Sequence, residues 1–76
     1  MVIKILGTGC PKCKMLEENA GKAVAQTGTD AEVVKVTELN DIINYGVMVT
    51  PALVIDEEVK SAGKVLSPQE ISAFLK

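Results

Sequence analysis

Two cysteines stand close together in the segment "GTGCPKC", residues 7–13, and they are the only thiols of the chain. A Cys-x-x-Cys pair can exchange electrons with disulfides, or its thiolates can bind a soft metal ion. A disulfide across so small a loop adds little to stability, which disfavours a purely structural role. The 76 residues contain no histidine, which excludes Cys–His nucleophilic catalysis and any Cys/His zinc site within one chain.

The setting of Cys10 and Cys13 favours redox chemistry, because Pro11 between them is suited to open a helix. Cys10 would then be the N-cap, where unpaired backbone N–H groups and the positive end of the helix dipole favour a thiolate. Helix geometry puts the two Cα atoms about 5 Å apart, within the roughly 4.4–6.8 Å that a disulfide spans. We expect Cys10 to attack a target disulfide. We expect Cys13, on the apolar side of the helix, to resolve the mixed disulfide.

The rest of the chain predicts four strands and three helices that position this pair. Short β-branched runs predict the strands at residues 2–6, 31–36, 51–55 and 59–62. The first helix follows the cysteines and is stopped by Gly28. We expect Thr37 to cap a second, short helix that Gly46 stops. Ser67-Pro68-Gln69-Glu70 is a typical helix start with a capping box.

The short helix carries the apolar residues Leu39, Ile42 and Ile43. In the last helix, Ile71, Phe74 and Leu75 are expected to form the buried side. The order βαβαββα indicates one α/β domain over residues 1–76, with a four-stranded mixed sheet flanked by three helices. The first helix joins two parallel strands. The last two strands are too close for a crossover and form an antiparallel hairpin around the acidic turn at residues 56–58.

Charge and composition exclude several classes of partner. The net charge is −2 and all eight basic residues are lysines, so no arginine fork is available for phosphate or guanine. One tyrosine and one phenylalanine cannot form a base-stacking platform, and we expect no nucleic-acid partner. The apolar runs are far shorter than the roughly 18 residues that cross a membrane. The opening "MVIKIL" lacks the features of a signal peptide, so we expect a cytoplasmic protein without a membrane partner.

Two segments resemble a known superfamily. "CPKCKM" after a strand is similar to the thioredoxin active site and to the Cys-Pro-x-Cys of glutaredoxins. "VTPALVID" resembles the Thr-Pro that opens a strand in these proteins. The whole chain is similar to the small prokaryotic thioredoxin-like proteins called redox-active disulfide proteins. The resemblance implies a minimal thioredoxin fold, with Pro51 cis beside the disulfide and Thr50 offering backbone groups to an extended substrate segment.

The same resemblance implies a protein disulfide reductase that acts through Cys10 and Cys13 without a bound cofactor. Its partners would be disulfide-containing proteins and a flavoprotein disulfide reductase as electron donor, and the protein would be a monomer. Thioredoxins also carry a buried aspartate six residues before the first cysteine, which helps the second cysteine lose its proton. Lys4 stands at that offset here, and the sequence names no replacement proton acceptor.

Two other functions use the same cysteines. Small copper or mercury chaperone domains have Gly-Met-x-Cys-x-x-Cys after the first strand, but they run βαββαβ, and Thr8 stands here where their methionine lies. A soft-metal (Cu, Hg or Zn) trafficking domain is therefore an alternative. A redox sensor that changes partner on oxidation is another.

Overall fold

The computed structural model describes residues 1–9 and 11–75. In this part of the chain the order is βαβαββα, as predicted. All four strands end at the predicted residue, and three of them begin one residue away from the predicted start. The elements are β1 (Val2–Leu6), α1 (Pro11–Thr27), β2 (Glu32–Val36), α2 (Leu39–Asn44), β3 (Ala52–Ile55), β4 (Glu58–Ala62) and α3 (Pro68–Leu75).

The four strands form one mixed sheet in the order β2-β1-β3-β4. The neighbours β1 and β2 are parallel, and α1 makes the connection between them. The other two pairs, β1 with β3 and β3 with β4, are antiparallel. The predicted mixed sheet is confirmed, and β1 lies inside it with a partner on each side.

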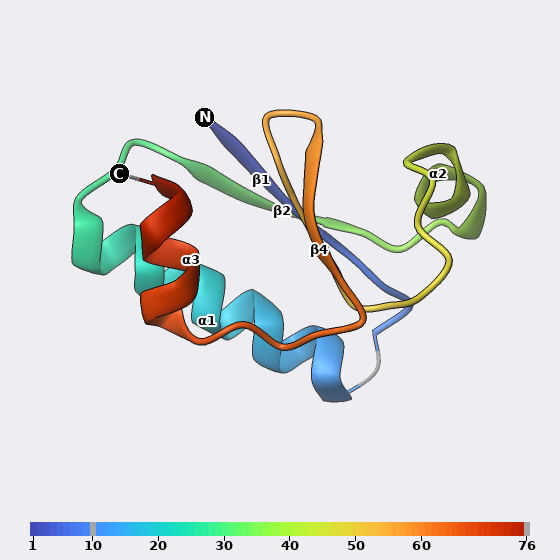
Figure 1. The fold of residues 1–76 in the computed structure, drawn as a ribbon, viewed down its shortest axis with the longest axis horizontal. Helices are drawn as coiled ribbons and strands as arrows, with labels where there is room; N and C mark the ends of the chain where they lie inside the picture. The colour runs from blue at the N-terminus through green and yellow to red at the C-terminus, as the bar shows by residue number, and fades with distance from the viewer. Residues whose placement is uncertain (10, 76) are drawn as a thin grey trace.

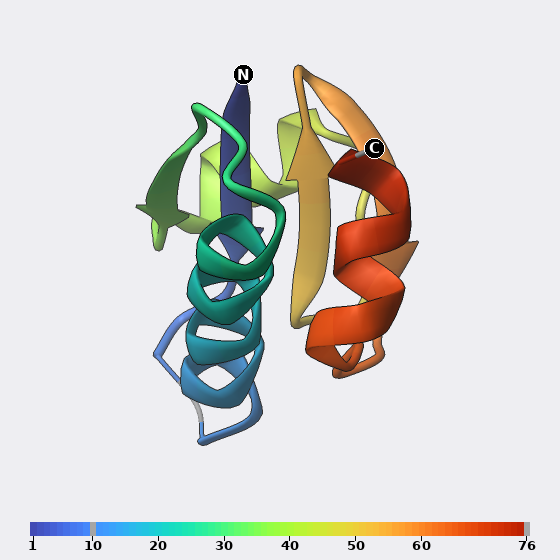
Figure 2. The ribbon, with the colours of Figure 1, turned by 90° about the vertical axis from the view of Figure 1, so that its left-hand side faces the viewer.

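The helices divide between the two faces of the sheet (Figures 1 and 2). Figure 2 shows α1 and α3 side by side on one face and α2 behind the sheet. The long helix α1 packs against α3 as well as against β1 and β2. A four-stranded mixed sheet flanked by three helices is the minimal thioredoxin fold that the sequence predicted.

Each face of the sheet has its own apolar cluster, because successive side chains of a strand point to opposite sides. In β1, Ile3 and Ile5 face α1 and α3, whereas Leu6 faces α2. The larger cluster contains Ile3, Ile5, Leu16, Ala20, Ala23, Leu53, Ile55, Leu66, Ile71 and Leu75. The smaller one contains Leu6, Ile42, Val47, Ala52 and Val54.

The start of α3 follows the sequence prediction, but its buried side does not. The Glu70 N–H donates to Ser67 Oγ over 3.2 Å and the Ser67 N–H donates to Glu70 Oε1 over 3.3 Å, which is the predicted capping box. The prediction that Phe74 is buried was wrong, since 41% of it is exposed. Small Ser72 takes its place on the buried side and donates to the Pro68 carbonyl over 2.7 Å. The helix is thus turned so that a small residue, and not a ring, meets the rest of the molecule.

The short helix α2 also departs from its prediction. Its N-cap is Glu38 and not Thr37, and no side chain caps it. Only Ile42 is buried, whereas Leu39 and Ile43 are exposed, because a helix of six residues turns less than twice and presents one narrow side to the sheet. The predicted stop at Gly46 is confirmed: its φ is 78° and its N–H donates to the Ile43 carbonyl over 2.8 Å.

The β3–β4 hairpin turns through two residues, Asp56 and Glu57, and not through three. Both have positive φ, 50° and 68°, as the type I′ turn of a tight hairpin requires. Glu58, predicted in the turn, is the first residue of β4. Asp56 also accepts a hydrogen bond from the Val2 N–H over 3.0 Å, which ties the turn to the start of β1.

Candidate active site

Cys13 lies in the first turn of α1, which begins at Pro11 as predicted. It is 5% exposed, in agreement with its expected position on the apolar side of the helix. Cys10 falls outside the described residues. Its N-cap position and its pairing with Cys13 therefore stay predictions.

Gly7 leaves the space in which the Cys13 sulfur lies. A Cβ atom built on Gly7 would be 2.3 Å from Cys13 Sγ and 3.1 Å from Cys13 Cβ, far inside van der Waals contact. The Gly7 N–H donates to the Val36 carbonyl over 3.0 Å, so this backbone continues the pairing of β1 with β2 and has little freedom to move away. Sequence reasoning did not single out Gly7. The available signal was a glycine directly after a buried strand and close before the cysteines.

Pro51 lies at the same end of the sheet. The Thr50–Pro51 peptide bond is cis, which confirms the isomer that the family resemblance implied. Leu6 is opposite Ala52 in the antiparallel register, and one further step brings Pro51 to the level of Gly7. The proline is buried, whereas Thr50 is exposed. Cys13 and Pro51 are thus both brought to Gly7, with Thr50 on the adjoining surface.

A pocket of about 110 Å³ opens beside Cys13. Its charged members are Lys14 and Glu17 on α1 and Lys35 on β2. The complete lining is Ile5, Gly7, Gly9, Cys13, Lys14, Glu17, Lys35 and Thr37. Glu17 Oε2 lies 3.4 Å from Lys35 Nζ, so an ion pair spans from α1 to β2 at this pocket. Sequence reasoning missed Glu17, although its position four residues after Cys13 places both on one side of the helix.

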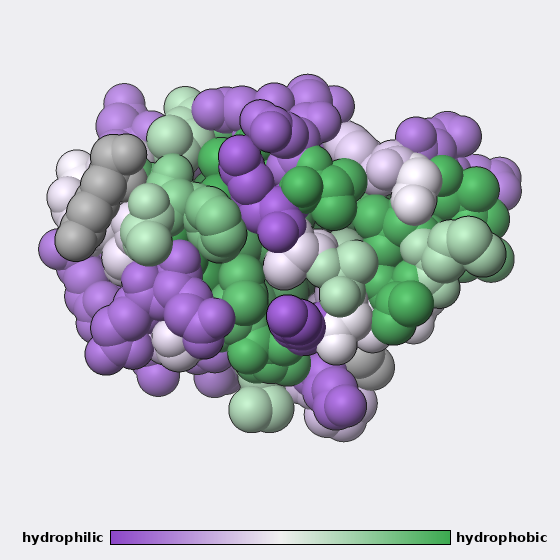
Figure 3. All heavy atoms as spheres, in the orientation of Figure 1, coloured by the Kyte–Doolittle hydropathy of each residue, from purple (hydrophilic) through white to green (hydrophobic). Residues whose placement is uncertain are grey.

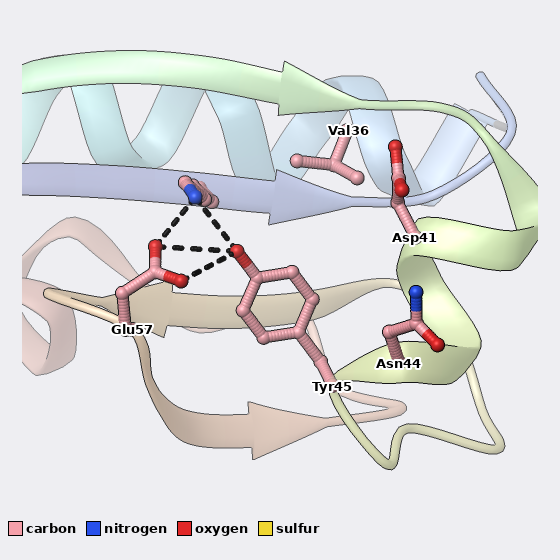
Figure 4. Close-up of a pocket in the computed structure, with 6 residues that line it drawn as sticks. Val36, Asp41, Asn44, Tyr45 and Glu57 are labelled. Carbon is pink, nitrogen blue, oxygen red and sulfur yellow. Dashed lines mark hydrogen bonds and ion pairs between the residues drawn. The ribbon is translucent and has the colours of Figure 1, made fainter.

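A second pocket, of about 460 Å³, lies on the α2 face and is lined by Lys4, Val36, Asp41, Asn44, Tyr45 and Glu57 (Figure 4). Its centre is a hydrogen-bonded triad. Lys4 Nζ donates to Tyr45 Oη over 2.7 Å and to Glu57 Oε1, and the Tyr45 hydroxyl donates to both Glu57 oxygens over 3.1 and 3.2 Å. The sequence placed Glu57 in an acidic turn and did not indicate these contacts, because the two partners of Glu57 come from β1 and from the end of α2.

The triad holds both of its ionic groups in the charged form. The hydrogen bond to Glu57, and next that to Tyr45, raises the pKa of Lys4 above its ordinary value. The hydrogen bond from Lys4 lowers the pKa of Glu57. Two groups so firmly charged are poor proton carriers near neutral pH. The larger pocket is therefore built around a structural contact, and the smaller one adjoins the candidate reactive sulfur.

Comparison with known proteins identifies the family. A family model described as the thioredoxin domain matches residues 1–76. A protein of Methanocaldococcus jannaschii named thioredoxin is 49% identical over 76 residues, which cover 100% of this chain and 87% of that protein. One of Methanothermobacter thermautotrophicus, also named thioredoxin, is 45% identical over 75 residues, which cover 99% and 97% of the two chains. This chain belongs to the thioredoxin family. Membership supports thiol–disulfide exchange as its general activity.

The surface before the Thr-Pro segment of this thioredoxin-family chain offers exposed apolar side chains. Met48 is 96% exposed, and Val49 beside it is also exposed. Leu39 and Ile43 on α2 extend this surface, and Figure 3 shows apolar side chains gathered over α2 and the loop that follows it. We call these four residues the apolar rim. Met48 and Val49 of the rim directly precede Thr50 and Pro51 in the sequence.

The order of elements bears on the metal-trafficking alternative. The order βαβαββα differs from the βαββαβ of metal-trafficking domains, which separates the two folds.

Within residues 1–9 and 11–75, no group of three or more cysteine, aspartate or glutamate side chains is placed to hold a metal ion. In the same ranges, no helix is long and apolar enough to cross a bilayer.

Proposed function

We propose that this thioredoxin-family protein is a protein disulfide reductase in which Cys10 is the nucleophile and Cys13 resolves the intermediate. The observation that carries the proposal is the position of Cys13: it is buried in the first turn of α1, with its sulfur against Gly7, at the sheet end where Pro51 lies. A helix start favours thiolates, and the two residues between the cysteines keep the sulfurs within bonding reach.

The reaction has two exchange steps. The Cys10 thiolate attacks one sulfur of the substrate disulfide and releases the other as a thiolate, which takes up a proton. Cys13 then attacks the Cys10 sulfur of the mixed disulfide and releases the second substrate thiol. The substrate gains two electrons and two protons, and the protein is left with a Cys10–Cys13 disulfide.

Protein substrates bind beside Pro51 in this proposal. Thr50 is exposed and offers its backbone groups to an extended substrate segment, and the apolar rim supplies side-chain contacts next to it. The protein acts as a monomer without a bound cofactor. A flavoprotein disulfide reductase, which draws on NADPH or another electron carrier, regenerates the dithiol in the reducing cytoplasm.

Reduction of insulin or of DTNB, an aromatic disulfide, in the presence of dithiothreitol tests the proposal. We expect Cys10→Ser to lose essentially all activity. Cys13→Ser should react once and stop as a mixed disulfide that mass spectrometry detects. Lys12→Gln is the matched control in the same motif, and its activity should stay within roughly fivefold, because an exposed charge at a helix end contributes at most about 1 kcal/mol.

Two results would contradict the proposal. One is full activity in Cys10→Ser. The other is an inactive native protein that binds one equivalent of Cu(I) or Zn²⁺ tightly in a competition titration, which would support metal trafficking instead. A native protein with slow turnover and an oxidation-dependent partner complex would support a redox sensor.

A further inference from the structure

The resolving step requires Cys13 to lose a proton where little water reaches it. Cys13 is 5% exposed, and burial disfavours the thiolate that must attack the mixed disulfide. Lys4, at the offset of the usual buried aspartate, lies on the opposite face of the sheet in the triad with Tyr45 and Glu57. It does not line the pocket beside Cys13. The proton must therefore go to another group.

We propose that Glu17, held by Lys35, is the proton acceptor for Cys13 in the resolving step. This inference rests on the proposed function, and it adds the proton acceptor that the resolving step of that function still lacks. Glu17 is the one carboxylate among the described residues that line the Cys13 pocket. It follows Cys13 by four residues on α1, so the two side chains lie on the same side of the helix, one turn apart.

The pocket provides the path for the proton. At about 110 Å³ it has room for a few water molecules, each of which takes about 30 Å³ in the liquid. The Glu17 side chain is 31% exposed, so a proton that arrives on its carboxylate can pass on to bulk water. Transfer from the Cys13 thiol through water to Glu17 needs no movement of the helix.

Two lysines give the pocket its charge balance. Lys35 Nζ, 3.4 Å from Glu17 Oε2, positions the carboxylate by an ion pair between β2 and α1. Lys14 lines the same pocket from the residue after Cys13 and stabilises the negative charge that forms on the sulfur. The charged residues of this lining are Lys14 and Glu17 from α1 and Lys35 from β2.

The step balances without any further reactant. In the mixed disulfide, Cys10 is bonded to the substrate sulfur. The Cys13 proton moves to Glu17 as the Cys13 sulfur bonds to that of Cys10. The bond from Cys10 to the substrate breaks, and its electron pair leaves with the substrate sulfur, which takes a proton from water. Glu17 then returns its proton to solvent.

The test follows the two steps separately by stopped-flow absorbance with one equivalent of DTNB. The reduced protein releases one thionitrobenzoate when Cys10 attacks and a second when Cys13 resolves. In Glu17→Gln we expect the first release to be unchanged and the second to be about 10²-fold slower at pH 7, since a positioned base contributes about 10²–10⁴-fold. The deficit should shrink as the pH rises, because hydroxide then removes the Cys13 proton.

Glu18→Gln is the matched control, with the same loss of charge on the exposed side of α1. It should match the wild type in both releases, and circular dichroism checks that both variants are folded. Equal behaviour of the two variants would overturn the inference. So would equal slowing of both releases in Glu17→Gln, or a deficit that is constant with pH. A wild type without a second release would overturn the proposed function itself, and the inference with it.

Discussion

The two faces of the sheet differ in how they are covered. The face beneath α1 and α3 is closed by a continuous apolar cluster of aliphatic residues from strands and helices. The face beneath α2 has a smaller cluster near Leu6 and then passes into the polar triad and an open pocket of about 460 Å³. Cys13 belongs to the helix on the closed face. The apolar rim belongs to the loosely covered face. The difference separates the closely packed side that holds Cys13 from a side that carries exposed apolar residues.

The single strand β1 produces both faces. Its alternating side chains send Ile3 and Ile5 into the closed cluster, while Lys4 enters the triad. One helix of six residues cannot cover a four-stranded sheet. A polar side chain therefore lies on the uncovered area of the sheet, and its hydrogen-bonding groups need partners. Tyr45 and Glu57 supply the partners, and they join the end of α2 and the hairpin turn to the middle of the sheet.

The largest expected contrast in stability is between truncation of an apolar side chain on α1 and truncation of one on α2. Leu16→Ala removes a fully buried side chain from α1, and we expect it to lower the free energy of unfolding by about 2–5 kcal/mol. Ile43→Ala on exposed α2 should change it by less than about 0.5 kcal/mol. Urea denaturation measures both. Similar losses would mean that the α2 face is packed as firmly as the other.

A methyl group at Gly7 tests the contact at the end of the closed face. We expect Gly7→Ala to lower the free energy of unfolding by about 1–3 kcal/mol, because its Cβ would collide with the Cys13 sulfur. Disulfide reduction should fall with it as the sulfur is displaced. Gly21→Ala is the control within α1: no atom lies within 4 Å of its added Cβ, and alanine should stabilise the helix by about 1 kcal/mol. Normal activity in Gly7→Ala would show that the sulfur has room to move.

The smallest expected effect concerns the triad of the open face and depends on pH. The pKa of Glu57 is lowered in the folded state, so its contribution to stability is present above its unfolded pKa and is lost as the pH falls through the folded value. The pKa of Lys4 is raised, so its contribution is present below its unfolded pKa and is lost only as the pH rises through the folded value.

The direction in which stability changes with pH is checked by urea denaturation midpoints measured from neutral to acid pH. We expect Glu57→Gln to be less stable than the wild type at neutral pH and the gap to narrow as the pH falls through the lowered pKa of Glu57, where the wild-type carboxylate is protonated as well. Glu18→Gln, remote from the triad, should follow the wild-type profile. A gap that widens in acid would show that the triad does not stabilise the fold through its charges.

Much of the architecture was predictable because its signals are local. The capping box at Ser67 and Glu70, the stop at Gly46 and the start of α1 at Pro11 each depend on a few neighbouring residues, and all three were found as expected. The failed predictions, at Thr37 and Phe74, concern how a helix is rotated or capped against the rest of the molecule. Propensity and periodicity leave that rotation open, since packing partners decide it.

The amino-acid sequence by itself determined the order of elements and put Cys13 in the first turn of the first helix, because backbone propensities, caps and turns act over short distances. The tertiary structure alone decided which groups meet: Gly7 with the Cys13 sulfur, Glu17 with Lys35, and Lys4 with Glu57. Each of these contacts joins different segments of the fold. Their geometry follows from strand register and helix packing, and these are set by burial of the whole apolar surface at once.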